Sequence, residues 1–242
     1  MTLATCGTAL PAVAEGLVHL RDVDPSIRQD IRYATANNFT GRPVPGYEAG
    51  ECLLLAGVAK ALAAVQRDLA QRGLSLKVYD CYRPRRAVAA FWAWARDDDE
   101  ASFSPRHHPR IERSRLHGLG YIARSSTHAQ GISVDLTLVA LSPASKGEPD
   151  PRRLQAPCHL APLEKGPDAS LDMGTAFDCF DIRSQVGAPG LEPAQREARL
   201  ILRDAMERQG FAGYAVEWWH FTHMPSAAGA RSLDIPVRRP AR

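Results

Sequence analysis

Two short stretches that lie far apart in the chain carry the residues most suited to bind a metal ion, and the fold must bring them together. The first holds His128 and Asp135, and the second holds Glu217 and His220. A catalytic zinc ion takes three nitrogen or oxygen ligands, keeps a fourth position for water, and needs a nearby base for the proton of that water. The sequence therefore predicts zinc on His128, Asp135 and His220. Glu217 is left as the candidate base.

The stretch around the first two candidate ligands predicts a tight turn followed by a β-strand. Gly131 comes soon after His128, and glycine permits the sharp turn that leads into a strand. Apolar and polar residues then alternate from 132 to 139, a period of two that indicates a strand. This alternation places Asp135 on the polar face of a mostly apolar strand.

The second stretch is also predicted to be a strand, but its geometry is less constrained. Residues 214–222 are rich in aromatic side chains, which are typical of strands. On a strand, Glu217 and His220 face opposite sides unless a β-bulge or a strand end intervenes. On a helix the two side chains share a face. The sequence leaves both alternatives open.

Helical periodicity is clearest in residues 52–73, where apolar side chains recur every three or four positions and Gly73 suits the C-terminal end. A second helix is predicted at 193–209, with a proline at its start and Gly210 as terminator. The other predicted elements are strands at 30–35 and 76–82 and a helix at 87–96. Helices interspersed with few strands predict an α+β fold, in which one compact domain has a small, mainly antiparallel sheet flanked by helices.

The overall composition is that of a globular protein and excludes several classes of partner. A chain of 242 residues suits one domain, and 45% hydrophobic and 24% charged residues are ordinary for such a domain. A formal net charge of +3 is too small to indicate a nucleic-acid partner. No stretch is long and apolar enough to predict a transmembrane segment. The sequence carries no signal for a particular oligomeric state.

Residues 1–14 differ from the rest of the chain, and we expect them to precede a folded domain that spans 15–242. They are weakly apolar and end in an A-x-A pattern like that of a secretory cleavage site, but they lack a basic beginning. A signal-peptide remnant and a disordered leader are therefore both open. The first implies the periplasm or cell envelope, and the second permits a cytoplasmic protein.

Five cysteines bear on the same question, because disulfides form in oxidising compartments. If Cys6 belongs to the leader, four cysteines remain, and four cysteines allow three pairings. We expect Cys52–Cys81 and Cys158–Cys179, because each pair closes a short loop around a motif. The alternative is four buried free thiols in a cytosolic enzyme.

Four motifs occur in one order along the chain. They are Asn38-Phe39-Thr40-Gly41, Asp80-x-Tyr82-Arg83-Pro84, Ser126-x-His128-x-x-Gly131-x-x-x-Asp135 and Glu217-x-x-His220. Together they resemble the zinc D-alanyl-D-alanine dipeptidases, a family that includes the enzymes of vancomycin resistance and their envelope relatives. The resemblance implies a compact α+β fold like that of D,D-carboxypeptidases and of the hedgehog signalling domain.

The resemblance also implies roles for single residues. It implies one zinc ion on the three ligands predicted above, with Glu217 as the general base. It implies that Arg83 stabilises the transition state beside the scissile carbonyl group. Ser126, Tyr33 and Asp178 match positions that contact the substrate, with Asp178 facing the free ammonium group. Arg83 has an alternative role as a structural ion-pair partner, and Asp178 has one as a loop cap.

The function predicted from these residues is hydrolysis of the small dipeptide D-alanyl-D-alanine to two D-alanines. One alternative is a zinc D,D-carboxypeptidase or endopeptidase that acts on cell-wall peptides, and another is a zinc-bearing binding module without catalysis. Glu217 and Arg83 disfavour the binding module, because a structural zinc site needs neither. Residues 140–170 are predicted to form an irregular surface excursion, longer than in the vancomycin-resistance enzymes, which bears on how strictly dipeptides are preferred.

Overall fold

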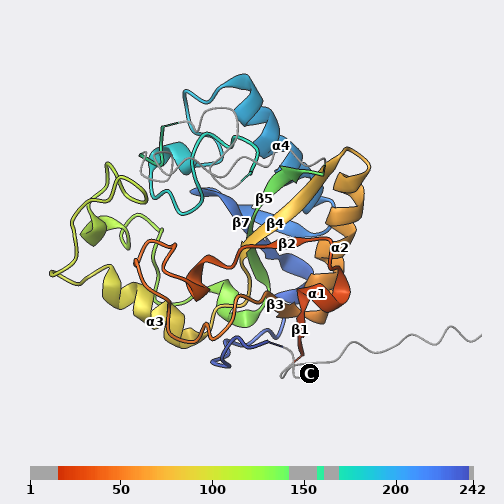
Figure 1. Ribbon diagram of the computed structural model, residues 1–242, viewed down its shortest axis with the longest axis horizontal. Helices are drawn as coiled ribbons and strands as arrows, with labels where there is room; N and C mark the ends of the chain where they lie inside the picture. The colour runs from red at the N-terminus through yellow and green to blue at the C-terminus, as the bar shows by residue number, and fades with distance from the viewer. Residues whose placement is uncertain (1–15, 142–156, 161–168, 240–242) are drawn as a thin grey trace, which may run out of the picture.

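A mixed β-sheet forms the centre of the fold (Figure 1). The computed structural model describes residues 16–141, 157–160 and 169–239. Within these ranges the sheet has five strands in the order β2-β4-β5-β7-β6, with β2 parallel to β4 and the other neighbours antiparallel. The strands are β2 (Arg28–Gln29), β4 (Leu74–Asp80), β5 (Ser133–Ala140), β6 (Phe211–Tyr214) and β7 (Glu217–His223). The predicted α+β fold with a mainly antiparallel sheet is confirmed.

Two long helices lie along one side of the sheet, and a third lies apart from them (Figure 1). The helices α2 (Ala56–Ala70) and α4 (Pro193–Glu207) contact each other and the sheet. α2 buries an apolar stripe that recurs every three or four residues, and α4 begins with a proline and a capping box. The third helix, α3 (Arg85–Trp94), follows β4 and Pro84; it confirms the helix predicted at 87–96 but begins and ends two residues earlier.

The segment before α2 corrects the predicted start of that helix. Residues 53–55 are not helical but form β3 (Leu53–Leu55), which pairs antiparallel with β1 (Leu17–His19). The short helix α1 (Leu20–Val23) follows β1. The helix expected at 52–73 is therefore confirmed only from Ala56 onward, because the preceding apolar residues are used in a small second sheet.

The strand predicted at 30–35 is wrong. The pairing with β4 is made by Arg28 and Gln29 of β2, which precede residues 30–35. Beyond them, the backbone N–H of Asp30 donates one further hydrogen bond to the carbonyl oxygen of Val78. The chain then turns through the 3-10 helix η1 (Arg32–Ala34). This turn buries the ring of Tyr33 against the rings of Phe39 and Phe91, so tertiary packing overrides the local preference for an extended chain.

The segment predicted as one strand at 214–222 holds most of β7 and the turn that joins it to the last residue of β6, so it is part of a two-strand hairpin. Gly213 pairs with Phe221, whereas the next residue, Tyr214, pairs with Glu217. The three residues between the two partners in β7 therefore form an irregular step in the ladder, as a bulge does. The strand alternative with a bulge is confirmed, and the helix alternative is excluded.

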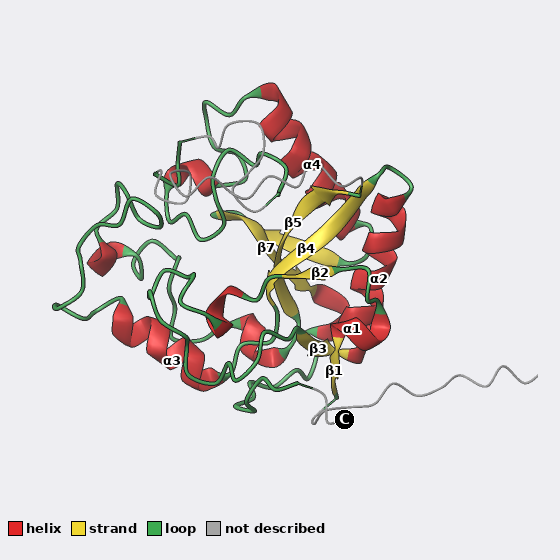
Figure 2. Cartoon of the chain, viewed as in Figure 1, coloured by secondary structure: helices red, strands yellow, loops and turns green. Residues whose placement is uncertain are grey.

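Much of the chain outside these elements is irregular, especially between α3 and β5 (Figure 2). The remaining short helical turns are η2 (Arg113–Arg115), η3 (Thr127–Gln130), η5 (Ile182–Ser184) and η6 (Met224–Ser226). Residues 1–14 and most of the excursion predicted at 140–170 lie outside the described residues. In the part of the chain that is described, no helix combines the length and apolarity of a membrane span.

Two disulfide bonds join cysteines that are 29 and 21 residues apart in sequence. They join Cys52 to Cys81 and Cys158 to Cys179, which confirms the expected pairing. The alternative of four buried free thiols is therefore wrong. Cys6 lies outside the described residues.

Candidate active site

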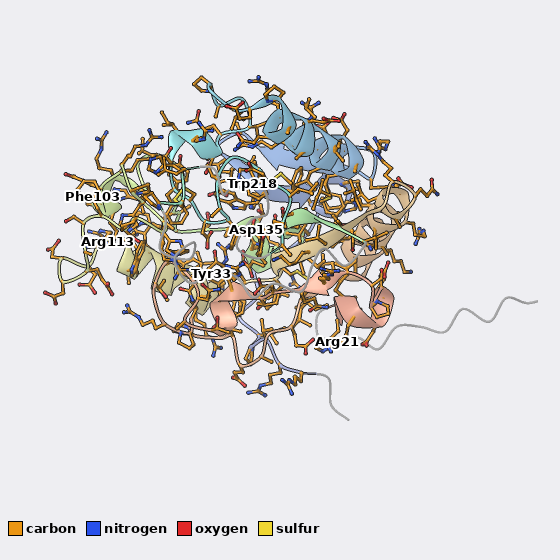
Figure 3. The ribbon with its side chains drawn as sticks, turned by 45° about the horizontal axis from the view of Figure 1, so that its top comes forward. Arg21, Tyr33, Phe103, Arg113, Asp135 and Trp218 are labelled. Carbon is orange, nitrogen blue, oxygen red and sulfur yellow. A yellow bond between two sulfur atoms is a disulfide. The ribbon has the colours of Figure 1, made fainter. Side chains whose placement is uncertain are left out.

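Three adjacent strands place polar side chains in one row across the sheet. Asp135 of β5 lies opposite Asp80 of β4 on one side and opposite His220 of β7 on the other. Directly opposed residues of antiparallel strands project from the same face, so these three side chains gather on one face. A bulge between Val78 and Asp80 shifts the pairing of β4 with β5 by one residue. This shift brings Asp80 opposite Asp135. Figure 3 shows Asp135 near the centre of the molecule, with Tyr33 close by in that view.

His128 reaches the same point from η3, the short helix that precedes β5. The hydroxyl group of Ser126 accepts a hydrogen bond of 3.2 Å from the backbone N–H of His128, as an N-cap residue does. The helix ends at Gly131, whose φ of 69° is the left-handed conformation that glycine adopts without strain. The turn predicted at this glycine is confirmed, and it brings His128 to Asp135.

The donor atoms of His128, Asp135 and His220 converge on one point. His128 Nε2 lies 3.3 Å from Asp135 Oδ1 and 3.1 Å from His220 Nδ1, and His220 Nδ1 lies 3.1 Å from the same carboxylate oxygen. Ligand atoms about 2.0 to 2.1 Å from a tetrahedral zinc ion are roughly 3.3 Å apart. The three side chains therefore fit a single metal ion with one coordination position left open.

A neighbouring carbonyl group determines which nitrogen of His128 faces this point. His128 Nδ1 lies 2.6 Å from the carbonyl oxygen of Cys81, which can only accept, so Nδ1 carries the proton and Nε2 presents a lone pair. Burial lowers the pKa of His220, which keeps its ring neutral. Burial alone would raise the pKa of Asp135, but His128 and His220 hold it below its ordinary value. One anionic and two neutral donors suit a divalent cation.

Glu217 stands at the start of β7 and lines the same cavity as His220. The step in the β6–β7 ladder allows the two side chains to face one cavity although they are three residues apart. Burial raises the pKa of Glu217 well above its ordinary value, and the charges of Asp135 and Asp178 add to the rise. A carboxyl group with a raised pKa is suited to exchange protons.

Arg83 lines the cavity, and the carboxylates of Asp80 and Asp135 hold its guanidinium group in place. Its Nε and Nη2 atoms each lie 2.9 Å from Asp80 Oδ2, and Nη2 lies 3.4 Å from Asp135 Oδ2. The guanidinium carbon lies 5.3 Å from the ring centroid of Tyr33 and 4.9 Å from that of Phe91. The structural ion pair considered from the sequence is present. It orients the group toward the cavity, so the structural and chemical roles are compatible.

Tyr33 and Asp178 meet in the wall of the cavity. The hydroxyl group of Tyr33 donates a hydrogen bond of 2.9 Å to Asp178 Oδ2, and both side chains are buried. Burial raises the pKa of Asp178 well above its ordinary value, the charge of Asp135 adds to the rise, and the bond from Tyr33 opposes it. Within the described residues no ion pair to Asp178 is observed. A buried carboxylate in this state is stabilised by a cationic ligand.

The cavity itself has a volume of about 530 Å³. Apolar side chains from α3 and from the loop before β5 form much of its wall, including Phe91 and Ile122. Every residue predicted for the site lines it: Tyr33, Arg83, Ser126, His128, Asp135, Asp178, Glu217 and His220. A mostly apolar cavity with a few convergent polar groups is the usual form of a small-molecule site.

Several known proteins are similar to this chain over most of its length. A family model described as D-ala-D-ala dipeptidase matches residues 13–148 and 160–238. A D-alanyl-D-alanine dipeptidase of Enterococcus faecium is 33% identical over 223 residues, which are 92% of this chain and 98% of the relative. Proteins of the same name are 35% identical in Enterococcus faecalis, over 85% of this chain and 90% of the relative, and 31% identical in Escherichia coli, over 88% and 86%.

The chain belongs to the D-ala-D-ala dipeptidase family. Membership makes it a hydrolase of the metallopeptidase class, with a dipeptidase function. The resemblance drawn from the four sequence motifs is thereby confirmed. The metal dependence of the class agrees with the cluster of His128, Asp135 and His220.

Two tyrosines in the cavity wall of this dipeptidase were not singled out by the sequence. The hydroxyl group of Tyr214 donates a 3.1 Å hydrogen bond to the carbonyl oxygen of Gly120, and its ring centroid lies 5.8 Å from that of His220. Tyr121 lines the cavity beside Phe180. A Cβ atom at Gly120 would lie only 2.7 Å from the Tyr214 hydroxyl oxygen. In the sequence, the pair Gly120-Tyr121 just before the Ser126-x-His128 motif was the one feature that could have pointed to these tyrosines.

Three other histidines, His107, His108 and His117, are not part of the cluster formed by His128, Asp135 and His220. His107 Nδ1 lies 3.3 Å from the carbonyl oxygen of Asp178, and burial lowers the pKa of His107 to about 3, so its ring is neutral. His108 and His117 pack against tryptophan rings of α3. The ring of His107 therefore supports the segment that carries Asp178.

Proposed function

We propose that this protein is a zinc-dependent dipeptidase that hydrolyses D-alanyl-D-alanine to two D-alanines. The observation that carries the proposal is the convergence of the donor atoms of His128, Asp135 and His220 in the cavity wall, where Glu217 also lies. The substrate is supported by relatives from Enterococcus and Escherichia coli that carry the name D-alanyl-D-alanine dipeptidase.

Zinc suits the donor set, because it accepts two imidazoles and a carboxylate and keeps one position for the reaction. When bound, zinc supplies Lewis-acid chemistry that acidifies water and polarises a carbonyl group. Glu217 accepts the proton of the attacking water and later returns it to the leaving amine. The burial that raises the pKa of Glu217 supports this exchange.

Arg83 stabilises the negative charge that develops on the scissile carbonyl oxygen. Its planar guanidinium group offers several fixed donors, and its contacts with Asp80 and Asp135 hold it in place before the substrate arrives. Loss of one such preorganised donor typically costs about 100- to 1000-fold in rate.

The two ends of the dipeptide are bound by different groups. Asp178 and Tyr33 bind the free ammonium group, because the buried carboxylate has no ion-pair partner among the residues that the structure describes. The hydroxyl group of Ser126 accepts a bond from the backbone of η3, and its own proton remains available to donate to an oxygen atom of the substrate.

The test of this function measures both the metal requirement and the substrate. The protein is stripped of metal with a chelator, reloaded with zinc, and assayed on D-alanyl-D-alanine, on L-alanyl-L-alanine and on a longer peptide that ends in two D-alanines. We expect hydrolysis of the first substrate alone, and only after zinc is restored. Preferred cleavage of the longer peptide would instead indicate the carboxypeptidase alternative.

The role of Glu217 is tested separately by the substitution Glu217→Gln. The variant keeps the shape of the side chain but cannot accept the proton of water at neutral pH. We expect it to retain zinc, measured by elemental analysis, and to lose about 100- to 10,000-fold in kcat. Near-normal turnover in a zinc-loaded variant would show that another group is the base.

A further inference from the structure

The two disulfide bonds are attached to the active site at different points. Cys81 directly follows Asp80 at the end of β4, and Cys179 directly follows Asp178. Both bonds lie in the packed interior, because all four cysteines are buried. Each bond therefore fixes the backbone beside a residue of the site.

Beside the disulfide Cys52–Cys81, the backbone around Cys81 makes two hydrogen bonds to His128, a proposed metal ligand. The carbonyl oxygen of Cys81 accepts the hydrogen bond of 2.6 Å from His128 Nδ1. The backbone N–H of Arg83 donates to the carbonyl oxygen of His128 at 3.2 Å, and that of Tyr82 donates to Leu53 at 2.9 Å. The ring orientation of His128 thus depends on where this short segment lies.

The disulfide ties that segment to a framework outside the site. Cys52 donates its backbone N–H to Gln29 Oε1 at 2.9 Å, and its carbonyl oxygen accepts from the N–H of Leu20 at 2.9 Å. A covalent bond from this framework limits the movement of the Cys81 carbonyl group. Loss of a group that orients a metal ligand typically costs about 10- to 100-fold in metal affinity.

The second bond supports the other half of the site. Asp178 has a φ of 57°, a conformation that non-glycine residues rarely adopt and that needs support from its surroundings. The disulfide joins the next residue, Cys179, to Cys158. Cys158 is itself held by backbone hydrogen bonds to Pro105 at 2.8 Å and from Ala176 at 3.1 Å.

We propose that the two disulfides position different halves of the active site. The metal-side disulfide, Cys52–Cys81, sets the histidine ring through the Cys81 carbonyl group. The amine-side disulfide, Cys158–Cys179, sets the carboxylate of Asp178. The inference rests on the proposed function, which assigns a metal ion to the first half and the substrate ammonium group to the second.

The experiment compares two matched double variants, Cys52→Ala with Cys81→Ala and Cys158→Ala with Cys179→Ala, both carrying Cys6→Ser to remove the remaining thiol. Zinc affinity is measured by competition with a chelating dye. The visible spectrum of the cobalt-loaded protein reports the ligand geometry. KM and kcat for D-alanyl-D-alanine are measured at saturating zinc, and circular dichroism confirms the fold.

We expect the two variants to differ in which measurement changes. Loss of the metal-side disulfide should weaken zinc binding about 10- to 100-fold and shift the cobalt spectrum, while KM at saturating zinc stays near the wild-type value. Loss of the amine-side disulfide should raise KM about tenfold, the effect of weakening one charge-assisted contact, and leave the zinc affinity and the cobalt spectrum unchanged.

Two outcomes would overturn the inference. In one, both variants change zinc affinity and KM alike; in the other, both lose thermal stability while zinc affinity and KM remain normal. If a double variant does not fold, the same measurements are made on the Cys6→Ser protein during partial reduction with a phosphine, with thiol labelling to identify the opened bond. Zinc loss that does not follow opening of the metal-side bond overturns the inference as well.

Zinc binding and hydrolysis by the Cys6→Ser protein, the parent of both variants, separate this inference from the function on which it rests. A Cys6→Ser protein that neither binds zinc nor hydrolyses the dipeptide contradicts the proposed function, and the inference falls with it. A parent protein that does both, with variants that show no division of effects, contradicts the inference alone.

Discussion

Asp178 combines three features that seldom coincide in an ordinary loop residue. Its side chain is buried, its backbone has a positive φ, and its carboxylate accepts a hydrogen bond from Tyr33 without an ion-pair partner among the described residues. Burial of a carboxylate without an ion-pair partner raises the free energy of the empty site, and a bound ammonium group lowers it. These features favour recognition of a cation over the loop-capping alternative.

The substitution Asp178→Asn tests this role. Asparagine tolerates a positive φ at least as well as aspartate, so we expect the fold to be retained while the charge is lost. We expect kcat/KM for the free dipeptide to fall about 10- to 100-fold, as for the loss of a charged hydrogen bond. The N-acetylated dipeptide serves as the control, because it lacks the ammonium group. If kcat/KM for the free dipeptide, divided by that for the N-acetylated dipeptide, is the same in the variant as in the wild type, Asp178 does not bind the ammonium group.

Single residues of the site differ in how far the sequence could predict them. His128, Asp135 and His220 were accessible because metal binding depends on side-chain type and spacing. The contact from the Cys81 carbonyl group to His128 was not, because every residue has a carbonyl group and its direction depends on the fold. Tyr214 was missed for a related reason, since its contact with Gly120 joins segments that are distant in sequence.

At the scale of elements, the turn between η3 and β5 sets the positions of His128 and Asp135, two of the proposed metal ligands. Gly131 ends η3 with a left-handed backbone and its carbonyl oxygen accepts from Leu55 in β3. Two residues later β5 begins, with Asp135 as its third residue. The geometry of this one turn therefore relates the ligand on η3 to the ligand on the strand.

The substitution Gly131→Ala tests the turn. A side chain is strained at a φ of 69°, and its Cβ would lie 2.6 Å from Leu17 Cδ2. We expect a loss of about 1 to 3 kcal/mol in the free energy of unfolding, measured by urea denaturation, together with weaker zinc binding. Gly73→Ala is the matched control, because Gly73 has a φ of 71° but open space around it. Equal zinc affinity in the two variants would contradict the role of the turn.

The elements themselves were predictable where periodicity was long and less so where tertiary contacts decide. The helices at α2 and α4 follow from repeated apolar positions, whereas residues 53–55 look helical in sequence but pair with β1. The hairpin of β6 and β7 was only partly predictable. Aromatic composition indicates strand, but the residues that the ladder skips depend on the register with β6.

For the molecule as a whole, the two disulfides bear on where the protein resides. Structural disulfides persist in oxidising compartments and are rare in the reducing cytosol. Both bonds are buried, and each closes a loop of moderate length, with sequence separations of 29 and 21 residues. We therefore propose the periplasm or cell envelope, which accords with the signal-like pattern of residues 1–14.

This localisation is tested by mass spectrometry of the protein recovered from separate cell fractions. We expect the envelope fraction to contain the chain with two disulfides intact when thiols are blocked before lysis. Recovery of the chain from the cytosolic fraction would favour the cytoplasmic alternative if its four cysteines are reduced, namely Cys52, Cys81, Cys158 and Cys179.

The row of Asp80, Asp135 and His220 across β4, β5 and β7 has a further consequence for folding. A slip of one residue between any two of these strands would turn the slipped side chain toward the opposite, apolar face. A metal ion that needs both Asp135 and His220 binds only the sheet with the native pairing, so it favours that pairing over its nearest competitors by its own binding free energy. Asp135 and His220, the two proposed metal ligands in this row, would thereby also act as a check on the correct pairing of β5 with β7.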